Sequence, residues 1–345
     1  MVQMWNEIWE QPVILERCYE KNIHAIIELV KVLRGKNISS ICIAARGTSD
    51  HAAVYAKYVL ELSTGIPVAL AASSVFTMYH KSINLKNSLV IGISQSGEAA
   101  DVLEVIKCAK KEGAITVSIT NFSSSPLALE SNYHLCCEAG LEKSVAATKT
   151  FTTQLYLIAQ LAAEWTDNSD LRTEISFIPE KISHTFEVSR IIEDKVGRYR
   201  FMNECFVLSR GINYAVSLEA ALKIQETTYV RAKAFATSDF QHGPIAMMDK
   251  DLPVFIFAPN GPSLKDMSEM ARKLKKDGME LIIISNNKEM LDLGTSSFYI
   301  PETDNDIVSP FFNVVVAQMF ACKLALVKGL DPDSPRGLNK VTITK

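Results

Sequence analysis

Short apolar runs alternate with longer stretches of helical spacing along the first half of the chain. The runs at residues 41–45, 88–93 and 115–120 are too short for helices and rich in β-branched residues, which predicts buried strands. Between the first two runs, residues 50–62 follow helical spacing, and after the second the apolar positions are Val102, Leu103, Val105, Ile106 and Ala109. Strands alternating with helices predict an α/β fold with a mostly parallel sheet and helices on both faces.

The pattern of the first half recurs in the second half at a fixed offset. Arg46-Gly47 returns as Arg210-Gly211, 164 positions later, and at the same offset Val90 meets Val254 and Gly97 meets Gly261. A fixed offset indicates a duplicated unit, so we expect two similar α/β domains. We place an N-terminal helical segment at 1–34, the first domain at 35–168, the second at 195–330 and a C-terminal tail at 331–345.

The stretch from residue 88 to residue 101 predicts an anion site. A strand is followed by the small polar turn Ser94-Gln95-Ser96-Gly97-Glu98 and then by a helix, which directs backbone N–H groups and a positive helix end at one spot. Ser94 and Ser96 would add hydroxyl donors, and Gly97 would let the backbone approach a phosphate. The alternative is that Ser94 only caps the helix. The second copy, Ala258-Pro259-Asn260-Gly261, lacks both hydroxyls, so we expect only the first copy to bind.

Composition excludes several classes of protein. The 345 residues carry a formal charge of −3 with no basic block, which argues against nucleic-acid binding. No apolar run approaches a membrane span, and the N-terminus does not resemble a secretory signal. The seven cysteines are scattered, which favours reduced thiols and a cytoplasmic protein. The six histidines show no metal-binding spacing, so we expect no metal and no cofactor.

Acid–base candidates lie in the second half and the tail. Lys223 and Glu226 share one helix face, His242 stands before Gly243-Pro244, and Lys340 lies near the C-terminus. Each has a plainer interpretation: a solvent-facing ion pair, a turn histidine and a mobile terminal lysine. If the anion is a sugar phosphate, His242 could open the ring and Glu226 could move a proton between neighbouring carbons, while Lys340 or Lys223 lies near the carbonyl.

Six motifs in this order resemble those of paired sugar isomerase (SIS) domains, and the resemblance covers nearly the whole chain. The similarity is to the isomerase half of glutamine–fructose-6-phosphate aminotransferases and, more closely, to stand-alone type II glucosamine-6-phosphate deaminases. The motifs are Gly47-Thr48-Ser49, Ser94-Gln95-Ser96-Gly97-Glu98, Val145-Ala146-Ala147-Thr148-Lys149, Ala221-Leu222-Lys223-Ile224-Gln225-Glu226, His242-Gly243-Pro244 and Pro335-Arg336-Gly337-Leu338-Asn339-Lys340.

The resemblance implies a role for each matching position. The turn Gly47-Thr48-Ser49 together with Ser94, Gln95 and Ser96 would hold the phosphate, and the backbone near Val145 would line the sugar site. Glu226 would shuttle the proton and Lys340 would reach the carbonyl carbon, with help from Lys223. His242 would open the ring, from its own or the partner subunit of a homodimer. Ala99 departs from the family, which has a threonine there in the aminotransferases.

The absence of a preceding glutaminase segment shapes the functional hypothesis. Position 2 is Val2 rather than a cysteine, and the isomerase-like part starts at once, so we expect no glutaminase domain. The expected reaction is conversion of glucosamine 6-phosphate to fructose 6-phosphate and ammonia. One alternative is a fructosamine-6-phosphate deglycase. Another, from a different class, is a non-catalytic sugar-phosphate sensor.

Overall fold

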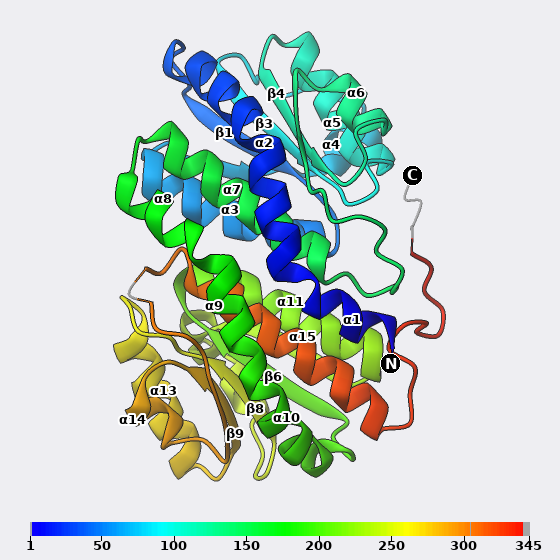
Figure 1. Cartoon of the computed structure of the whole chain (residues 1–345). Coiled ribbons are helices and arrows are strands. Elements are labelled where there is room, and N and C mark those ends of the chain that lie inside the picture. Colours follow the sequence, from blue (N-terminus) through cyan, green and yellow to red (C-terminus); the bar gives the residue numbers. More distant parts are fainter. Residues whose placement is uncertain (1, 304, 341–345) are drawn as a thin grey trace. The chain divides into compact units, whose positions relative to one another are not determined.

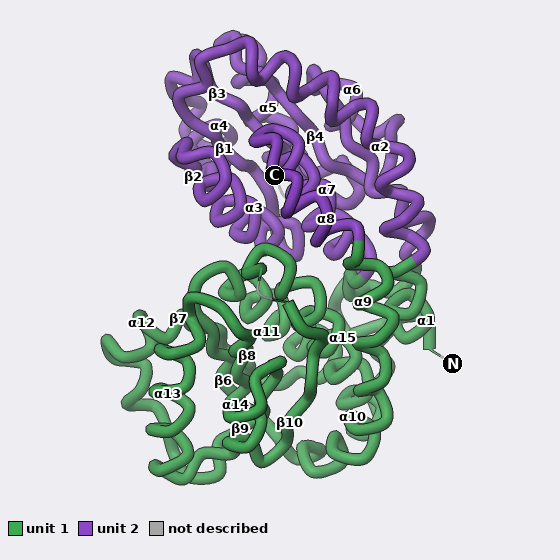
Figure 2. Tube along the Cα trace, turned by 60° about the vertical axis from the view of Figure 1, so that its left-hand side comes forward, with its two compact units in different colours: residues 1–12, 143–148, 177–338 green, residues 13–142, 149–176, 339–345 purple. Residues whose placement is uncertain are grey.

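The computed structural model describes residues 2–303 and 305–340 of the 345-residue chain, and its contacts divide the chain into two compact units (Figure 2). Unit 1 consists of Met1–Pro12, Lys143–Thr148 and Phe177–Leu338. Unit 2 consists of Val13–Glu142, Lys149–Ser176 and Asn339–Lys345. Each unit is therefore assembled from segments that are distant in sequence, and the domain boundaries expected from the sequence remain a prediction.

Unit 2 is built on a five-stranded parallel sheet in the order β2-β1-β3-β4-β5. All six residues of β3 and of β4 are buried, as the continuous apolar runs predicted. The strands are β1 (Ser40–Ala44), β2 (Val68–Leu70), β3 (Ser88–Ile93), β4 (Ile115–Thr120) and β5 (Tyr133–Cys136).

Helices cover both faces of this sheet (Figure 1). On one face, Cys42, Ala44 and Val90 pack with side chains of α4, α5 and α6 into one apolar core. On the other face α3 packs against α7. The helices are α2 (Gln11–Arg34), α3 (Thr48–Thr64), α4 (Ser73–Thr77), α5 (Ala100–Lys111), α6 (Pro126–Glu130), α7 (Lys149–Trp165) and α8 (Ser169–Ser176).

Unit 1 repeats the plan, with a parallel sheet in the order β10-β9-β8-β6-β7. In chain order its first strand again lies between the second and the third, as in unit 2. The expectation of two similar α/β domains is therefore confirmed. The strands are β6 (Glu204–Ser209), β7 (Arg231–Ala236), β8 (Pro253–Phe257), β9 (Glu280–Ser285) and β10 (Ser296–Tyr299).

The helices of unit 1 also form two layers. Met267, Met270 and Leu274 of α13 pack on one face of the sheet, and the other face receives α11 and α15, which pack against each other. The helices are α1 (Gln3–Trp9), α9 (Ile178–Thr185), α10 (Ser189–Val196), α11 (Tyr214–Thr228), α12 (Thr237–Gln241), α13 (Leu264–Lys276), α14 (Lys288–Leu291) and α15 (Ser309–Val327), with 3-10 turns η1 (Phe186–Val188), η2 (Gly197–Tyr199), η3 (Gly211–Asn213) and η4 (Pro244–Met247).

The strongly apolar character of α15 was not predicted from the sequence. This helix is 19 residues long with a mean hydropathy of 1.7, enough by length and composition to cross a membrane, but 83% of its apolar window is buried inside the protein. Phe320 on α15 contacts the rings of Phe255 and Phe298 at centroid distances of 5.0 and 5.9 Å. A helix that is apolar all round is typical of a protein core, and α15 has that role in unit 1.

Helical spacing in the sequence also predicts helices over residues 146–165 and 180–196, and both differ from the observed elements. The helix expected from about residue 146 begins at Lys149, because residues 143–148 belong to unit 1, where the Val145 amide donates to the Asp333 carbonyl at 3.1 Å. The helix expected over residues 180–196 is interrupted by η1. There Phe186 is buried and stacks on Trp9, with a distance of 4.2 Å between the ring centroids. Tertiary packing therefore overrides the continuous helical pattern of the sequence.

Candidate active site

The strand order of unit 2 reverses between β1 and β3. After β1 the chain continues to β2 on one side of the sheet, and after β3 it continues to β4 on the other side. Ala44 at the end of β1 pairs with Gly92 near the end of β3. In open parallel sheets, ligands bind beyond the carboxyl ends of the strands at such a reversal of order. The two turns predicted to hold phosphate, residues 47–49 and 94–96, follow these strands, so the fold brings them to one edge.

The first turn leads into α3 without a side-chain cap. Gly47 precedes the helix with φ of +55°, in the left-handed region that favours glycine, and Thr48 is the first helical residue. Ser49 is buried, and its hydroxyl accepts a hydrogen bond from the Gln154 side chain at 3.0 Å. A hydroxyl that accepts can still donate its own proton, so Ser49 keeps a donor for an anion.

The second turn shows that Ser94 does not cap the helix. Helix α5 begins at Ala100, its N-cap is Ala99, and no side chain caps it. Ser94 instead accepts from the Gly97 amide at 3.1 Å, and Ser96 accepts from the Glu98 amide at 3.3 Å. The plainer interpretation of Ser94 is therefore wrong. Both hydroxyls retain a proton to donate, beside a helix start whose N-cap residue, Ala99, has no capping side chain. Within the first turn, the Asp101 carboxylate accepts from the Val102 amide at 2.9 Å.

Position 97 requires glycine for a reason other than the approach of a phosphate. Its φ is +68°, and an added Cβ would lie 2.2 Å from the Ser125 hydroxyl and 2.5 Å from the Ser125 Cβ. Ser125 caps α6 by accepting from the Ala128 amide. The close approach that requires glycine is thus between the turn and the start of α6, and the phosphate is not needed to explain it.

The charged residues of α11 form a buried ionic cluster in unit 1. The Lys223 side chain is fully buried, and its Nζ lies 2.6 Å from Glu226 and 3.3 Å from Glu219. Burial alone lowers the pKa of Lys223, but the charges of Glu219 and Glu226 outweigh it and raise that pKa well above its usual value. The Glu226 side chain keeps 21% of its surface exposed. The solvent-facing interpretation of Lys223 is wrong, since this lysine is a permanent buried cation that anchors an accessible carboxylate.

Glu219 was not among the acid–base candidates predicted from the sequence. It stands four residues before Lys223 and seven before Glu226, and this spacing places all three on one helix face. The signal was present in the sequence. Nothing in the local pattern showed that this face would be buried.

His242 lies on a different element from this cluster, at the end of α12 in unit 1. It is exposed at the C-terminal end of α12, where its amide donates to the Asp239 carbonyl at 3.1 Å. Among the described residues, no hydrogen bond or ion pair joins His242 to Lys223 or Glu226. Its role in ring opening remains a prediction.

The tail contributes Lys340 and holds the segment of Val145. In unit 2, Lys340 donates to the fully buried Glu142 carboxylate at 2.8 Å. In unit 1, the Asp333 carbonyl accepts from the Val145 amide, and the Asp333 carboxylate accepts from the Gln3 and Met4 amides at 2.7 Å each. Lys340 is therefore not a loose terminal lysine. The rest of the expected tail, residues 341–345, lies outside the described residues.

The equivalent reversal point of unit 1 is unsuited to an anion. The Asn260 amide donates to the Asn286 side chain at 2.7 Å, and an added Cβ at Gly261 would lie 3.2 Å from the Asp306 carboxylate. Desolvation by burial raises the pKa of Asp306 to about 6. A carboxylate at this position repels a phosphate, so the two copies have diverged as their turn sequences suggested.

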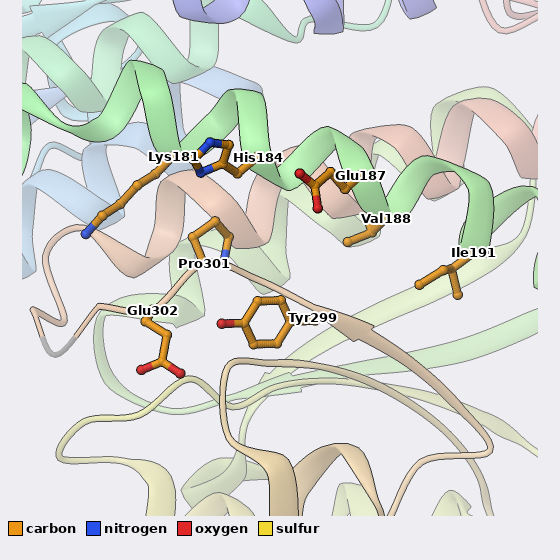
Figure 3. Close-up of a pocket in the computed structure, with 8 residues that line it drawn as sticks. All are labelled: Lys181, His184, Glu187, Val188, Ile191, Tyr299, Pro301 and Glu302. Carbon is orange, nitrogen blue, oxygen red and sulfur yellow. The ribbon is translucent and has the colours of Figure 1, made fainter.

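A separate surface pocket of about 610 Å³ contains none of the predicted residues (Figure 3). Helices α9 and α10 form one wall, and the chain that follows β10 forms the other. Its lining is mixed: Lys181 and His184, Glu187 and Glu302, and the apolar Val188, Ile191, Tyr299 and Pro301.

Over the described residues, no group of three or more His, Cys, Asp or Glu side chains could hold a metal ion.

The fold and the turns together define a duplicated parallel α/β protein with a candidate anion site in one copy. Residues 34–164 and 202–328 each match the SIS domain, so the chain belongs to the SIS domain family. The glutamine–fructose-6-phosphate aminotransferase of Photorhabdus laumondii is 31% identical over 98% of this chain. The match covers 58% of that relative, so the chain spans little more than half the length of such curated relatives.

Solved structures share the architecture of both units. A protein from Silicibacter pomeroyi DSS-3 assigned as a phosphosugar isomerase aligns with a TM-score of 0.88 and 30% identity, over 96% of this chain and all of the other. Glucosamine-6-phosphate deaminase from Thermotoga maritima aligns with a TM-score of 0.79 over 99% of this chain and all of the other. At 23% identity, that second likeness shows the fold alone.

Proposed function

We propose that this chain is a phosphosugar isomerase that acts as a deaminase, converting glucosamine 6-phosphate and water to fructose 6-phosphate and ammonia. The observation that carries the proposal is the ionic cluster of α11. There a buried lysine fixes Glu226, whose side chain stays 21% exposed. An anchored but accessible carboxylate is what proton transfer between neighbouring carbons requires.

The phosphate has a role in binding. Ser49, Ser94 and Ser96 keep hydroxyl protons to donate, and the amides at the start of α5 add a positive helix end. Binding energy gained at the phosphate, which is remote from the reacting carbons, fixes the position of the sugar. Ala99 supplies no hydroxyl, so the phosphate relies on the serines and the backbone.

The chemistry is a proton transfer followed by hydrolysis. His242 assists opening of the sugar ring, and Glu226 removes the proton from C2 of the open chain. Delivery of that proton to C1, together with transfer of one proton of the C2 ammonium to O1, turns the aldehyde into an alcohol and leaves an iminium at C2. Water hydrolyses the iminium, which yields the ketone of fructose 6-phosphate and releases ammonia. Lys223 holds the Glu226 carboxylate, and Lys340 acts near the carbonyl.

Two alternative functions, a deglycase and a sensor, predict different results in an activity assay. A deglycase would split a phosphorylated fructosamine and release the amine as an amino acid rather than as ammonia. A sensor would bind phosphosugars without turnover, and it would have no need of the cluster formed by Glu219, Lys223 and Glu226. The buried cluster favours an enzyme.

A substrate screen tests the proposal. Purified protein is incubated with phosphorylated aminosugars and fructosamines, and ammonia and fructose 6-phosphate are measured. We expect equal amounts of both from glucosamine 6-phosphate, and a loss of at least about 100-fold in kcat for Glu226→Gln. Glu269→Gln, the same change at an exposed position of α13, should retain the wild-type rate. Absence of ammonia from every aminosugar phosphate would remove the deaminase proposal.

We further propose that the protein acts in the cytoplasm as a homodimer. All seven cysteines are free, and burial raises the pKa of several, such as Cys136 to about 11, which suits a reducing compartment. The dimer rests on the family resemblance, which also allows His242 to act from the partner subunit. Light scattering on purified protein measures the oligomeric state.

A further inference from the structure

Glu142 is a fully buried carboxylate that accepts hydrogen bonds from two parts of unit 2. Its Oε1 accepts from the Thr150 amide at 3.2 Å, and its Oε2 accepts from the Thr150 hydroxyl at 2.8 Å. Thr150 is the second residue of α7, so Glu142 occupies the positive start of that helix. The third donor is the Lys340 ammonium, 2.8 Å from Oε2.

The contact determines where the end of the described tail lies. Residues 336–339 are exposed, whereas the Lys340 side chain is only 25% exposed. The tail thus returns to the protein at Lys340. There its ammonium forms an ion pair with Glu142. This contact narrows the range of positions that a flexible four-carbon side chain on an exposed segment samples.

Glu142 is suited to this task because it is itself rigid. Its side chain is fully buried and tied to the helix by two bonds, so its oxygen presents a fixed point to the ammonium. Removing a partner from a buried charge pair leaves an uncompensated charge, which makes such contacts persistent.

We propose that Glu142 is a positioning residue for the reaction, which holds the Lys340 ammonium at the place where it meets the sugar. This inference rests on the proposed function, because it assigns Glu142 a role through Lys340. Loss of the contact displaces Lys340 while the phosphate turns at residues 47–49 and 94–96 stay intact. The cost therefore falls on kcat rather than on KM, since a displacement of about 1 Å can cost about 100-fold in rate.

The kinetic test compares Glu142→Gln with Glu112→Gln. Glu142→Gln removes the charge that holds Lys340, and we expect kcat for glucosamine 6-phosphate to fall about 10- to 100-fold with KM within about threefold. Glu112→Gln is the same change at an exposed position of unit 2, so both constants should stay within about twofold. The double variant Glu142→Gln/Lys340→Met should be no slower than Lys340→Met alone, because both changes disable one unit. Independent, multiplying losses would overturn the proposal.

A second measurement needs no turnover and separates this inference from the proposed function. Acetylation of Lys340 by acetic anhydride, followed by mass spectrometry, should be at least about fivefold faster in Glu142→Gln than in wild type, because the amine is released to solvent. Lys323 is the internal reference, and Glu112→Gln should label like wild type. Should Glu142→Gln not fold, Glu142→Asp, with the same charge drawn back by one methylene, takes its place. Unchanged labelling in a folded variant would overturn the inference, whatever the substrate screen gives.

Discussion

At the scale of single residues, Lys223 shows what a local pattern can and cannot reveal. Its i, i+3 relation to Glu226 is readable from the sequence, and an ion pair was expected. Lys223 is completely buried, and α11 packs against β6, β7 and, about 90 residues further along the chain, α15. Such packing cannot be read from the local pattern, so surface and core lysines look alike in the sequence. Glu219 was missed for the same reason, because a carboxylate becomes notable only when its helix face is buried.

Asp306 gives a prediction about pH. Desolvation raises its pKa from 3.8 to about 6, so the folded state holds the proton more tightly than the unfolded state. Its stabilising contribution is complete below pH 3.8 and is lost as the pH rises through about 6. Asp306→Asn should therefore raise the free energy of unfolding at pH 7 by about 1–3 kcal/mol and leave it unchanged near pH 3.5.

Urea unfolding at the two pH values measures this effect. Asp277→Asn, the same change at an exposed position that follows α13, is the control and should show no such pH dependence. An equal change at both pH values would mean that Asp306 acts through its shape or its hydrogen bonds rather than through its charge.

At the scale of elements, strand–turn–helix units were largely predictable and their detailed contacts were not. The apolar runs at residues 88–93 and 115–120 match β3 and β4 because a fully buried parallel strand leaves a continuous apolar signature. The turn after β3 was identified, yet the need for Gly97 arises from Ser125, whose position depends on the fold. Likewise η1 interrupts a helical pattern where Phe186 meets Trp9.

The core role of α15 gives a prediction about stability. Phe320 is 1% exposed and contacts the rings of Tyr199, Phe255 and Phe298. Phe320→Ala should lower the free energy of unfolding of unit 1 by about 3–5 kcal/mol, through lost apolar burial and the cavity left behind. Leu326→Ala on the same helix, at a position 40% exposed, should cost less than about 1 kcal/mol.

Chemical denaturation followed by circular dichroism measures both variants. Similar losses for Phe320→Ala and Leu326→Ala would contradict the core role of Phe320, because alanine has a higher helix propensity than either residue it replaces.

At the scale of the whole molecule, the chain is a duplicated fold whose copies have diverged. Both sheets have the same strand order, but unit 2 carries hydroxyl-bearing turns at its reversal point while unit 1 carries Asn260 and Asp306. The duplication was readable from the fixed offset of 164 residues. The assembly of each unit from distant segments could not be predicted from the sequence. Residues 143–148 belong to unit 1 although unit 2 flanks them, and the chain from Asn339 belongs to unit 2 although it follows unit 1.

The division of labour between the copies is the central claim, and steady-state kinetics with glucosamine 6-phosphate test it most directly. We predict that Ser94→Ala/Ser96→Ala raises KM by at least about 100-fold with a smaller effect on kcat, since each of the two lost hydrogen bonds to a charged group is worth about 1.5–3 kcal/mol. Ser123→Ala, at an exposed serine of unit 2, should match wild type. An unchanged KM in the folded double variant would contradict the account.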